Sequence, residues 1–146
     1  MSVLITDEES GYGSDIEPLR RLAERALESE GVGHDAELSL ALVGTARMAE
    51  LNSHYLGREG ATDVLSFSQQ EEGLTGGENL LGDVIVCPQE VRDRRDAYQI
   101  QPGGEVALVV VHGILHLLGY DDASEEGNRV MDERARQILE GMKRDE

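Results

Sequence analysis

The sequence predicts an α+β domain with an α/β-layered arrangement, in which a small mixed four-stranded sheet is covered by about five helices. Strand-like segments alternate with helical ones over most of the chain, and helical segments then follow one another toward its end. A strongly apolar segment around residue 110 predicts that one of these helices is buried. Because no repeat and no linker divides the 146 residues, we expect a single domain over 1–146.

The first elements are a strand and an amphipathic helix. Residues 3–5 are a short apolar run suited to an edge or first strand. Pro18 stands near a first helical position, with Ser14 or Asp15 as possible caps, and the glycines of 31–33 end the helix. Its apolar residues repeat at the spacing of one helical face, namely Leu19, Leu22, Ala23, Ala26 and Leu27.

The middle of the chain predicts three more strands and a second helix. Leucines alternate with smaller residues over 38–43, the period of a strand with one strongly buried face. Thr45 can cap the helix that follows. The residues expected on its inner face are Met48, Leu51 and Tyr55. Segments 62–67 and 80–86 predict the remaining strands, and the glycine-rich acidic loop 68–79 between them is expected to be mobile.

The last third predicts helices alone. Pro88 opens a polar helix that we expect to run to about Tyr98, and a loop with two glycines then leads into the apolar helix. Ser124 begins a final amphipathic helix with glutamates in its first turn. The residues expected on its inner face are Met131, Ala135, Ile138 and Met142.

Two histidines, His112 and His116, lie in the apolar helix. A spacing of four residues puts both imidazoles on one helical face, where they can occupy two corners of a tetrahedral metal site. Gly119 follows where a helix would end in a left-handed residue, so the chain can turn back. Asp121 or Asp122 can then supply a third ligand. The spacing therefore indicates a candidate zinc site.

Two other interpretations of this segment remain open. Its run of three valines is β-branched and could form a buried strand, which would also put both histidines on one face. Histidines in an apolar helix can also be core residues whose hydrogen bonds are satisfied. The apolar run is too short to span a bilayer.

Composition limits the compartment and the partners. A single cysteine, Cys87, rules out an internal disulfide and fits a buried thiol in a reducing compartment. The N-terminus lacks the basic and apolar regions of a signal peptide, so we expect a cytoplasmic protein. The net charge of −17 argues against loose, sequence-blind binding to nucleic acid. The arginine clusters at 20–25 and 92–95 are interpreted as solvated helix faces.

Three segments together resemble the YbeY family of bacterial endoribonucleases and rRNA maturation factors. H-G-I-L-H-L-L-G-Y-D-D at 112–122 is similar to the family's hallmark His-Gly-x-Leu-His-Leu-x-Gly-Tyr-Asp-His. L-N-S-H-Y-L-G-R-E-G-A-T-D-V-L-S-F at 51–67 and L-L-G-D-V-I-V-C-P-Q-E-V at 80–91 are similar to two further family segments. Their order and spacing match across nearly the whole chain.

The resemblance implies a metal-dependent endoribonuclease specific for single strands. It implies roles in 3′-end maturation of 16S ribosomal RNA and in ribosome quality control. The expected partners are ribosomal RNA, the small ribosomal subunit and ribosomal or assembly proteins, with no membrane and no DNA. The family holds one metal ion, usually taken to be zinc, with three histidines, which fall on His112, His116 and Asp122.

The sequence departs from the family at two of these positions. Asp122 replaces the third histidine; a site of two histidines and an aspartate, with water in the fourth position, is chemically sound and more tolerant of harder metals such as manganese. Leu56 stands where the family has an arginine, and leucine cannot contact a phosphate or stabilise developing charge. Arg58, two residues on, is the candidate substitute.

The general base and the nucleophile are not assigned by the sequence. Asp121 and Asp83 are candidate bases, although Asp121 could equally support a ligand or a turn. Asp63 and Asp83 are also typical of turns and strand ends. The nucleophile could be water or a ribose 2′-hydroxyl.

Two other functions compete with the nuclease. A zinc peptidase of the metzincin type has the same ligand spacing, but Gly113 stands where such an enzyme needs its catalytic glutamate. A non-catalytic ribosome assembly factor with a structural metal is the second alternative, favoured by the loss of the arginine at Leu56.

Overall fold

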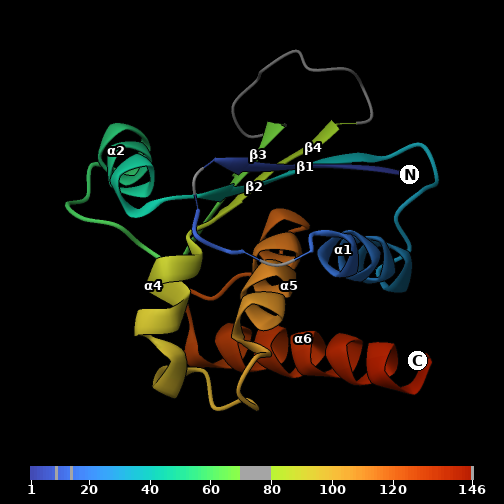
Figure 1. Cartoon of the computed structure of the whole chain (residues 1–146). Coiled ribbons are helices and arrows are strands. Elements are labelled where there is room, and N and C mark those ends of the chain that lie inside the picture. The colour runs from blue at the N-terminus through green and yellow to red at the C-terminus, as the bar shows by residue number, and fades with distance from the viewer. Residues whose placement is uncertain (9, 14, 70–79, 146) are drawn as a thin grey trace.

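Four strands form one sheet in the computed structural model, in the order β1-β2-β4-β3 (Figure 1). The structure describes residues 1–8, 10–13, 15–69 and 80–145. The strands are β1 (Ser2–Glu8), β2 (Glu37–Val43), β3 (Val64–Ser68) and β4 (Leu80–Val86). The helices are α1 (Glu17–Ser29), α2 (Thr45–Leu56), α4 (Pro88–Asp93), α5 (Glu105–Leu117) and α6 (Glu125–Asp145), with a short 3-10 turn at Arg95–Ala97. The expected α+β class with a mixed sheet is confirmed.

The sheet is mixed because β3 alone runs against its neighbour. β1 and β4 both pair with β2 in parallel, whereas β3 pairs with β4 in antiparallel register, with Val64 opposite Val86. The alternating leucines of β2 are buried, as the period of two predicts. The mobility expected for segment 68–79 concerns residues that, apart from those at 68–69, lie outside the described part of the chain.

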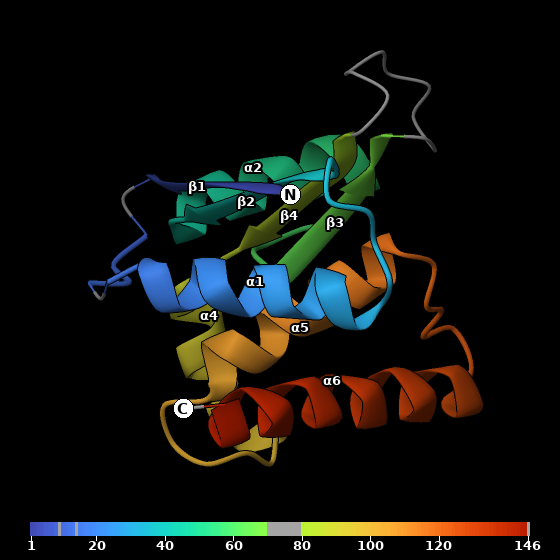
Figure 2. The same cartoon turned by 90° about the vertical axis from the view of Figure 1, so that its right-hand side faces the viewer.

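Helices cover both faces of the sheet. α1 and α5 pack on one face, and α6 crosses beneath them on the side away from the strands (Figures 1 and 2). Side chains from these three helices and the sheet form the larger core. α2 covers the other face with a smaller cluster that includes Met48, Leu51 and Cys87. α5 is therefore buried between the sheet and α6.

α5 comes close to the strands at a glycine. The hydroxyl of Ser66 donates a hydrogen bond of 2.8 Å to the carbonyl oxygen of Gly113. A Cβ atom at Gly113 would lie 2.6 Å from Cγ1 of Val84, so only glycine allows this approach without displacing a neighbour. The strand interpretation of the three valines is wrong, because tertiary packing places them inside a helix that is buried along most of its length.

The ends of α5 and α6 follow the expected chemistry. Gly119 has a φ of 108°, and the amide of Tyr120 donates to the carbonyl oxygen of Leu115, as in a glycine-terminated helix. The hydroxyl of Ser124 accepts a 3.0 Å hydrogen bond from the amide of Gly127, so the expected N-cap of the last helix is confirmed. These two turns define the short connection between α5 and α6.

Three local expectations differ from the structure. Thr45 does not cap α2, because the N-cap residue is Gly44 and no side chain bonds the helix start. Tyr55 is 53% exposed, since Asn52 takes the inward position and donates to the carbonyl oxygen of Gly60. The polar helix from Pro88 ends at Asp93 and continues only as the 3-10 turn, so it is shorter than expected.

Two simpler expectations concern the cysteine and the membrane. Cys87 is a free, fully buried thiol, as a single cysteine in an apolar strand end suggests. Among the helices that the structure describes, none is both long and apolar enough to span a bilayer.

Candidate functional site

The three metal ligands expected from the sequence border one cleft. His112 and His116 lie one turn apart on α5, and Asp122 lies in the connection to α6. All three line a cleft of about 690 Å3, together with the end of α2 and the start of β3. His112 is partly buried, whereas His116 and Asp122 are exposed. The fold therefore brings these residues, distant by up to ten positions, to the same surface.

Burial favours the neutral form of the His112 imidazole. Burial lowers its pKa below the ordinary value, and this outweighs the nearby carboxylate of Asp132, which raises it. Its buried Nε2 atom lies 3.2 Å from Oδ1 of Asp132. A neutral imidazole is the form that binds a metal ion.

The residues fit a metal ion in donor type, but they do not enclose one. Two imidazoles and a carboxylate are ordinary zinc ligands, and the imidazole of His112 is kept neutral by burial. Within the described ranges, however, no three histidine, cysteine, aspartate or glutamate side chains gather closely enough to hold an ion. Binding by His112, His116 and Asp122 therefore requires side-chain or loop movement that brings them together.

The two candidate bases lie apart from this cleft. One carboxylate oxygen of Asp121 accepts a 2.8 Å hydrogen bond from the amide of Ala123, the pattern of an Asx turn, and Asp121 does not line the cleft. Asp83 alternates with the buried Gly82 and Val84 that face α5, so its side chain lies on the opposite face of the sheet. Neither side chain is placed to act at the histidines.

Two arginines and the exposed Leu56 complete the cleft wall. Arg58 lines the cleft, and its guanidinium makes no hydrogen bond or ion pair with the described residues. Arg94 also lines it, but its guanidinium lies 3.6 Å from Asp63 and 3.4 Å from Glu90. Sequence reasoning missed Arg94, because its cluster was interpreted as a solvated face; only its packing beside the cleft distinguishes it.

Asp63 is held in place at the start of β3. The phenol of Tyr98 donates a 2.8 Å hydrogen bond to Asp63, and the Val64 amide donates to its other carboxylate oxygen at 2.9 Å. Burial first, and the Asp63 carboxylate second, raise the pKa of Tyr98 above its ordinary value. The expectation of a strand-end aspartate is met, and the contact joins β3 to the segment before α5.

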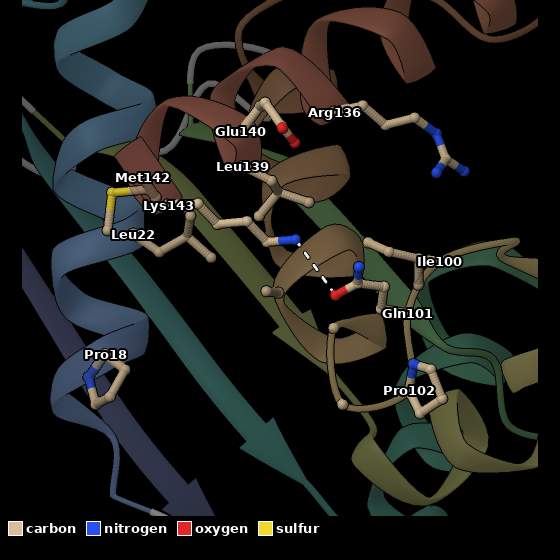
Figure 3. A pocket seen from close by; sticks show the side chains of 13 residues that line it. Pro18, Leu22, Ile100, Gln101, Pro102, Arg136, Leu139, Glu140, Met142 and Lys143 are labelled. Carbon is tan, nitrogen blue, oxygen red and sulfur yellow. Dashed lines mark hydrogen bonds between the residues drawn. The ribbon is translucent and has the colours of Figure 1, made fainter. Parts of the chain in front are cut away.

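A second cleft of about 520 Å3 lies between α1, the loop before α5 and the end of α6 (Figure 3). Its wall is mainly apolar, and the amine of Lys143 lies within 3.5 Å of the Gln101 side-chain oxygen. Arg136 lies at its edge and extends away from the other side chains. Because this cleft contains no histidine, the chemistry favours the cleft beside α5.

The fold and the cleft define the chain as an α+β domain that presents a histidine pair from a buried helix. The sequence model described as endoribonuclease YbeY matches residues 5–143. The chain therefore belongs to the endoribonuclease YbeY family.

Relatives with this family name match over most of their length. A protein named endoribonuclease YbeY from Pelotomaculum thermopropionicum is 42% identical over 124 residues, covering 83% of this chain and 82% of its own. The protein of the same name from Thermobifida fusca is 38% identical and covers 99% of this chain and 96% of its own. The solution structure of TM1509 from Thermotoga maritima has a TM-score of 0.62 at 28% identity, covering 98% of this chain and 93% of that one.

Proposed function

We propose that this protein is a metal-dependent endoribonuclease, specific for single strands, that acts in 16S rRNA 3′-end maturation and in ribosome quality control in the cytoplasm. The observation that carries the proposal is the cleft that His112, His116, Asp122 and Arg58 line together. The candidate metal ligands and a cation that can bind a phosphate therefore line the same cleft. Family membership supports the same reaction class.

The ion would be held by the histidine pair of α5 and a carboxylate. When bound, zinc or a harder divalent metal lowers the pKa of its water toward neutrality and polarises a phosphate. His112 is prepared for this because burial keeps its imidazole neutral. His116 offers the second nitrogen one helical turn away, at the exposed end of the pair.

The scissile phosphate would be bound by the cleft's arginines. Arg58 is the better candidate, since it makes no ion pair with the described residues and its charge is available to a substrate. Arg94 is partly neutralised by Asp63 and Glu90, so its contribution to phosphate binding is smaller. In this proposal Arg58 performs the task for which the family uses the arginine at the position of Leu56.

The partners follow from charge as well as from family. A protein with a net charge of −17 is repelled by generic RNA at long range. Recruitment to ribosomal RNA therefore requires additional contacts, for which the small ribosomal subunit and its ribosomal or assembly proteins are the proposed sources. Neither DNA nor a membrane is a proposed partner.

A non-catalytic assembly factor is the second candidate function. One observation favours it: Leu56, 45% exposed, lines the cleft where the family has a charged residue. A peptidase is disfavoured by Gly113, because a glutamate at that position would collide with the strands. Cleavage of RNA by the purified protein separates the nuclease from the assembly factor.

The test measures metal content and RNA cleavage on the same preparations. We expect about one zinc ion per chain in the wild type, and much less in His116→Ala and Asp122→Ala. Glu133→Gln is the matched control, because its carboxylate pairs with Arg129 and does not line the cleft. We also expect the wild type to cut single-stranded ribosomal RNA and both metal-site variants to lose this activity.

The products identify the nucleophile. Attack by water leaves a linear phosphate, whereas attack by the 2′-hydroxyl leaves a 2′,3′-cyclic phosphate. If the protein binds metal but does not cleave RNA, the result would favour the non-catalytic assembly factor. An absence of metal from the wild type under conditions that load other zinc proteins would contradict the metal dependence.

A further inference from the structure

Three ring side chains gather where the end of α2 meets β3. His54 and Tyr55 belong to the last turn of α2, and Phe67, the single phenylalanine of the chain, belongs to β3. The centroid of the Tyr55 ring lies 4.6 Å from that of His54 and 5.1 Å from that of Phe67. These three residues form an aromatic cluster in which Tyr55 contacts both other rings.

Tyr55 is the most accessible tyrosine of the protein. It is 53% exposed, whereas the other three tyrosines are partly buried. Leu56, the next residue along the chain, is 45% exposed. Phe67 is partly buried and packs on the smaller core, so it fixes one side of the Tyr55 ring to the sheet. The result is a supported aromatic ring with apolar surface open to a ligand.

The aromatic cluster adjoins the cleft of the proposed function. Leu56 and Phe67 both line that cleft, together with Arg58 and the two histidines of α5. β3 is the last strand in the sheet order, so no strand in the described part of the chain pairs with its outer edge. A chain-like ligand bound at Arg58 can therefore continue along this edge to Phe67 and Tyr55.

An unpaired nucleobase is the ligand that suits this surface. Aromatic side chains bind bases by stacking, with little dependence on which base it is, because every base has a flat π-face. Stacking needs no opposite charge, which matters for a protein whose net charge of −17 limits the gain from phosphate contacts. Bases of a duplex are already stacked on their neighbours, so only single-stranded RNA offers a base to Tyr55.

We propose that Tyr55, backed by Phe67, stacks on one unpaired base of single-stranded RNA, next to the phosphate held at Arg58. The inference rests on the proposed function and adds a base-binding position to its cleft. Leu56 fits this role, because a leucine where the family has an arginine extends the apolar surface beside the ring. Part of the RNA affinity then comes from a contact that does not depend on charge.

The test measures binding of a single-stranded fragment of the 16S rRNA 3′ end that carries 2-aminopurine in place of one adenine at a time. The fluorescence of 2-aminopurine is quenched when it stacks on an aromatic ring, and it is read before appreciable cleavage. Tyr55→Ala removes the ring, Tyr55→Leu keeps an apolar side chain without a ring, and Tyr55→Phe keeps the ring. Leu4→Ala is the matched control, because Leu4 is 64% exposed and lies on β1, at the opposite edge of the sheet. Thermal unfolding shows whether each variant folds.

We expect Tyr55→Ala and Tyr55→Leu to weaken RNA binding by roughly 5- to 150-fold, the range that corresponds to the loss of one stacked base. Tyr55→Phe should rescue the affinity, and Leu4→Ala should bind as the wild type does. At one position of the fragment, 2-aminopurine should be quenched by the wild type and Tyr55→Phe but not by Tyr55→Leu. The loss for Tyr55→Ala should be equal at low and high salt, whereas the loss for Arg58→Ala should shrink as salt rises.

The outcomes separate this inference from the proposed function. If the wild type cleaves RNA and Tyr55→Ala and Tyr55→Leu bind it as tightly, base stacking is overturned and the proposed function stands. If Tyr55→Ala weakens sedimentation with small-subunit particles but not binding to the fragment, the aromatic cluster binds a protein and the inference is also overturned. If the wild type binds the fragment and quenches 2-aminopurine through Tyr55 but cuts no RNA, the inference stands and the nuclease function fails.

Discussion

Arg58 differs in its ion pairs from Arg94, the other arginine that lines the cleft. Arg94 lies near Asp63 and Glu90, whereas Arg58 makes no ion pair with the described residues. A guanidinium without an ion pair, beside the proposed metal site, can bind phosphate oxygens. RNA cleavage by this protein therefore depends on whether Arg58 takes over the role of the family arginine that Leu56 replaces.

Replacing Arg58 by alanine should lower RNA cleavage on the order of 10- to 100-fold, because a cation that stabilises developing charge is lost. Initial rates on a single-stranded ribosomal fragment measure this. Arg92→Ala is the control, since Arg92 bonds Gln89 and Gly11 and does not line the cleft. Equal rates for wild type and Arg58→Ala would show that Arg58 does not bind the phosphate.

The phenol of Tyr98 should stabilise the fold through Asp63. Tyr98→Phe removes a hydrogen bond to a carboxylate and should reduce the free energy of unfolding by about 1–3 kcal/mol. Urea denaturation measures the loss, with Tyr55→Phe as an exposed control. No difference between the two variants would mean that water replaces this bond at no cost.

The same contact predicts a pH dependence. The folded-state pKa of Tyr98 is raised above its unfolded value of about 10. The contribution of the bond to stability is therefore complete below pH 10 and decreases as the pH rises above it. The stability difference between wild type and Tyr98→Phe should shrink between about pH 10 and 11. A difference that stays constant over this range would contradict the raised pKa.

At the scale of elements, the contact between α5 and the sheet sets the position of the histidines. Gly113 lies directly after His112, and its missing side chain lets the helix approach Val84 and Ser66. The cleft forms beside this contact, where the start of β3 meets α5. A change in the distance between helix and sheet would therefore move the candidate ligands.

Gly113→Ala should destabilise the protein by about 1–3 kcal/mol, although alanine is the better helix former by up to about 1 kcal/mol. The physical reason is the 2.6 Å approach of the new Cβ to Val84. Gly141→Ala on α6 is the control, because its Cβ would meet only the end of the Arg25 side chain. Thermal unfolding compares them, and a stabilised Gly113→Ala would show that the sheet yields at little cost.

At the scale of the whole molecule, the dominant feature is the net charge of −17. A negative protein gains little from counterion release on RNA, so affinity must come from a few local contacts. Small-subunit ribosomal particles should bind more than about 10-fold tighter than random single-stranded RNA at physiological salt, because proteins on the particle add contacts. Sedimentation with particles and filter binding to RNA measure this, and equal affinities would contradict it.

Local patterns in the sequence predict most of the helices and strands, and the sequence also contains the family motifs. Periodic leucines, the glycine after His116 and the serine cap of α6 are local signals, and local signals depend on neighbours within a few residues. Tyr55 and the end of α4 were wrongly predicted, because burial of Asn52 and the 3-10 turn depend on packing between distant segments. The ligand roles of His112, His116 and Asp122, and the catalytic roles of Arg58 and Asp121, stay predictions.

The groups that meet at the histidines are set by packing between distant segments. Asp132 follows His112 by twenty positions on another helix, and Arg94 reaches the cleft from the residue directly after α4, so no spacing rule relates them to the motif. Asp121 was a candidate base by sequence, yet its backbone turn occupies its carboxylate. Long-range contacts of this kind arise when apolar faces of α5, α6 and the sheet pack together, and that packing sets the positions of the polar groups that the motifs alone do not specify.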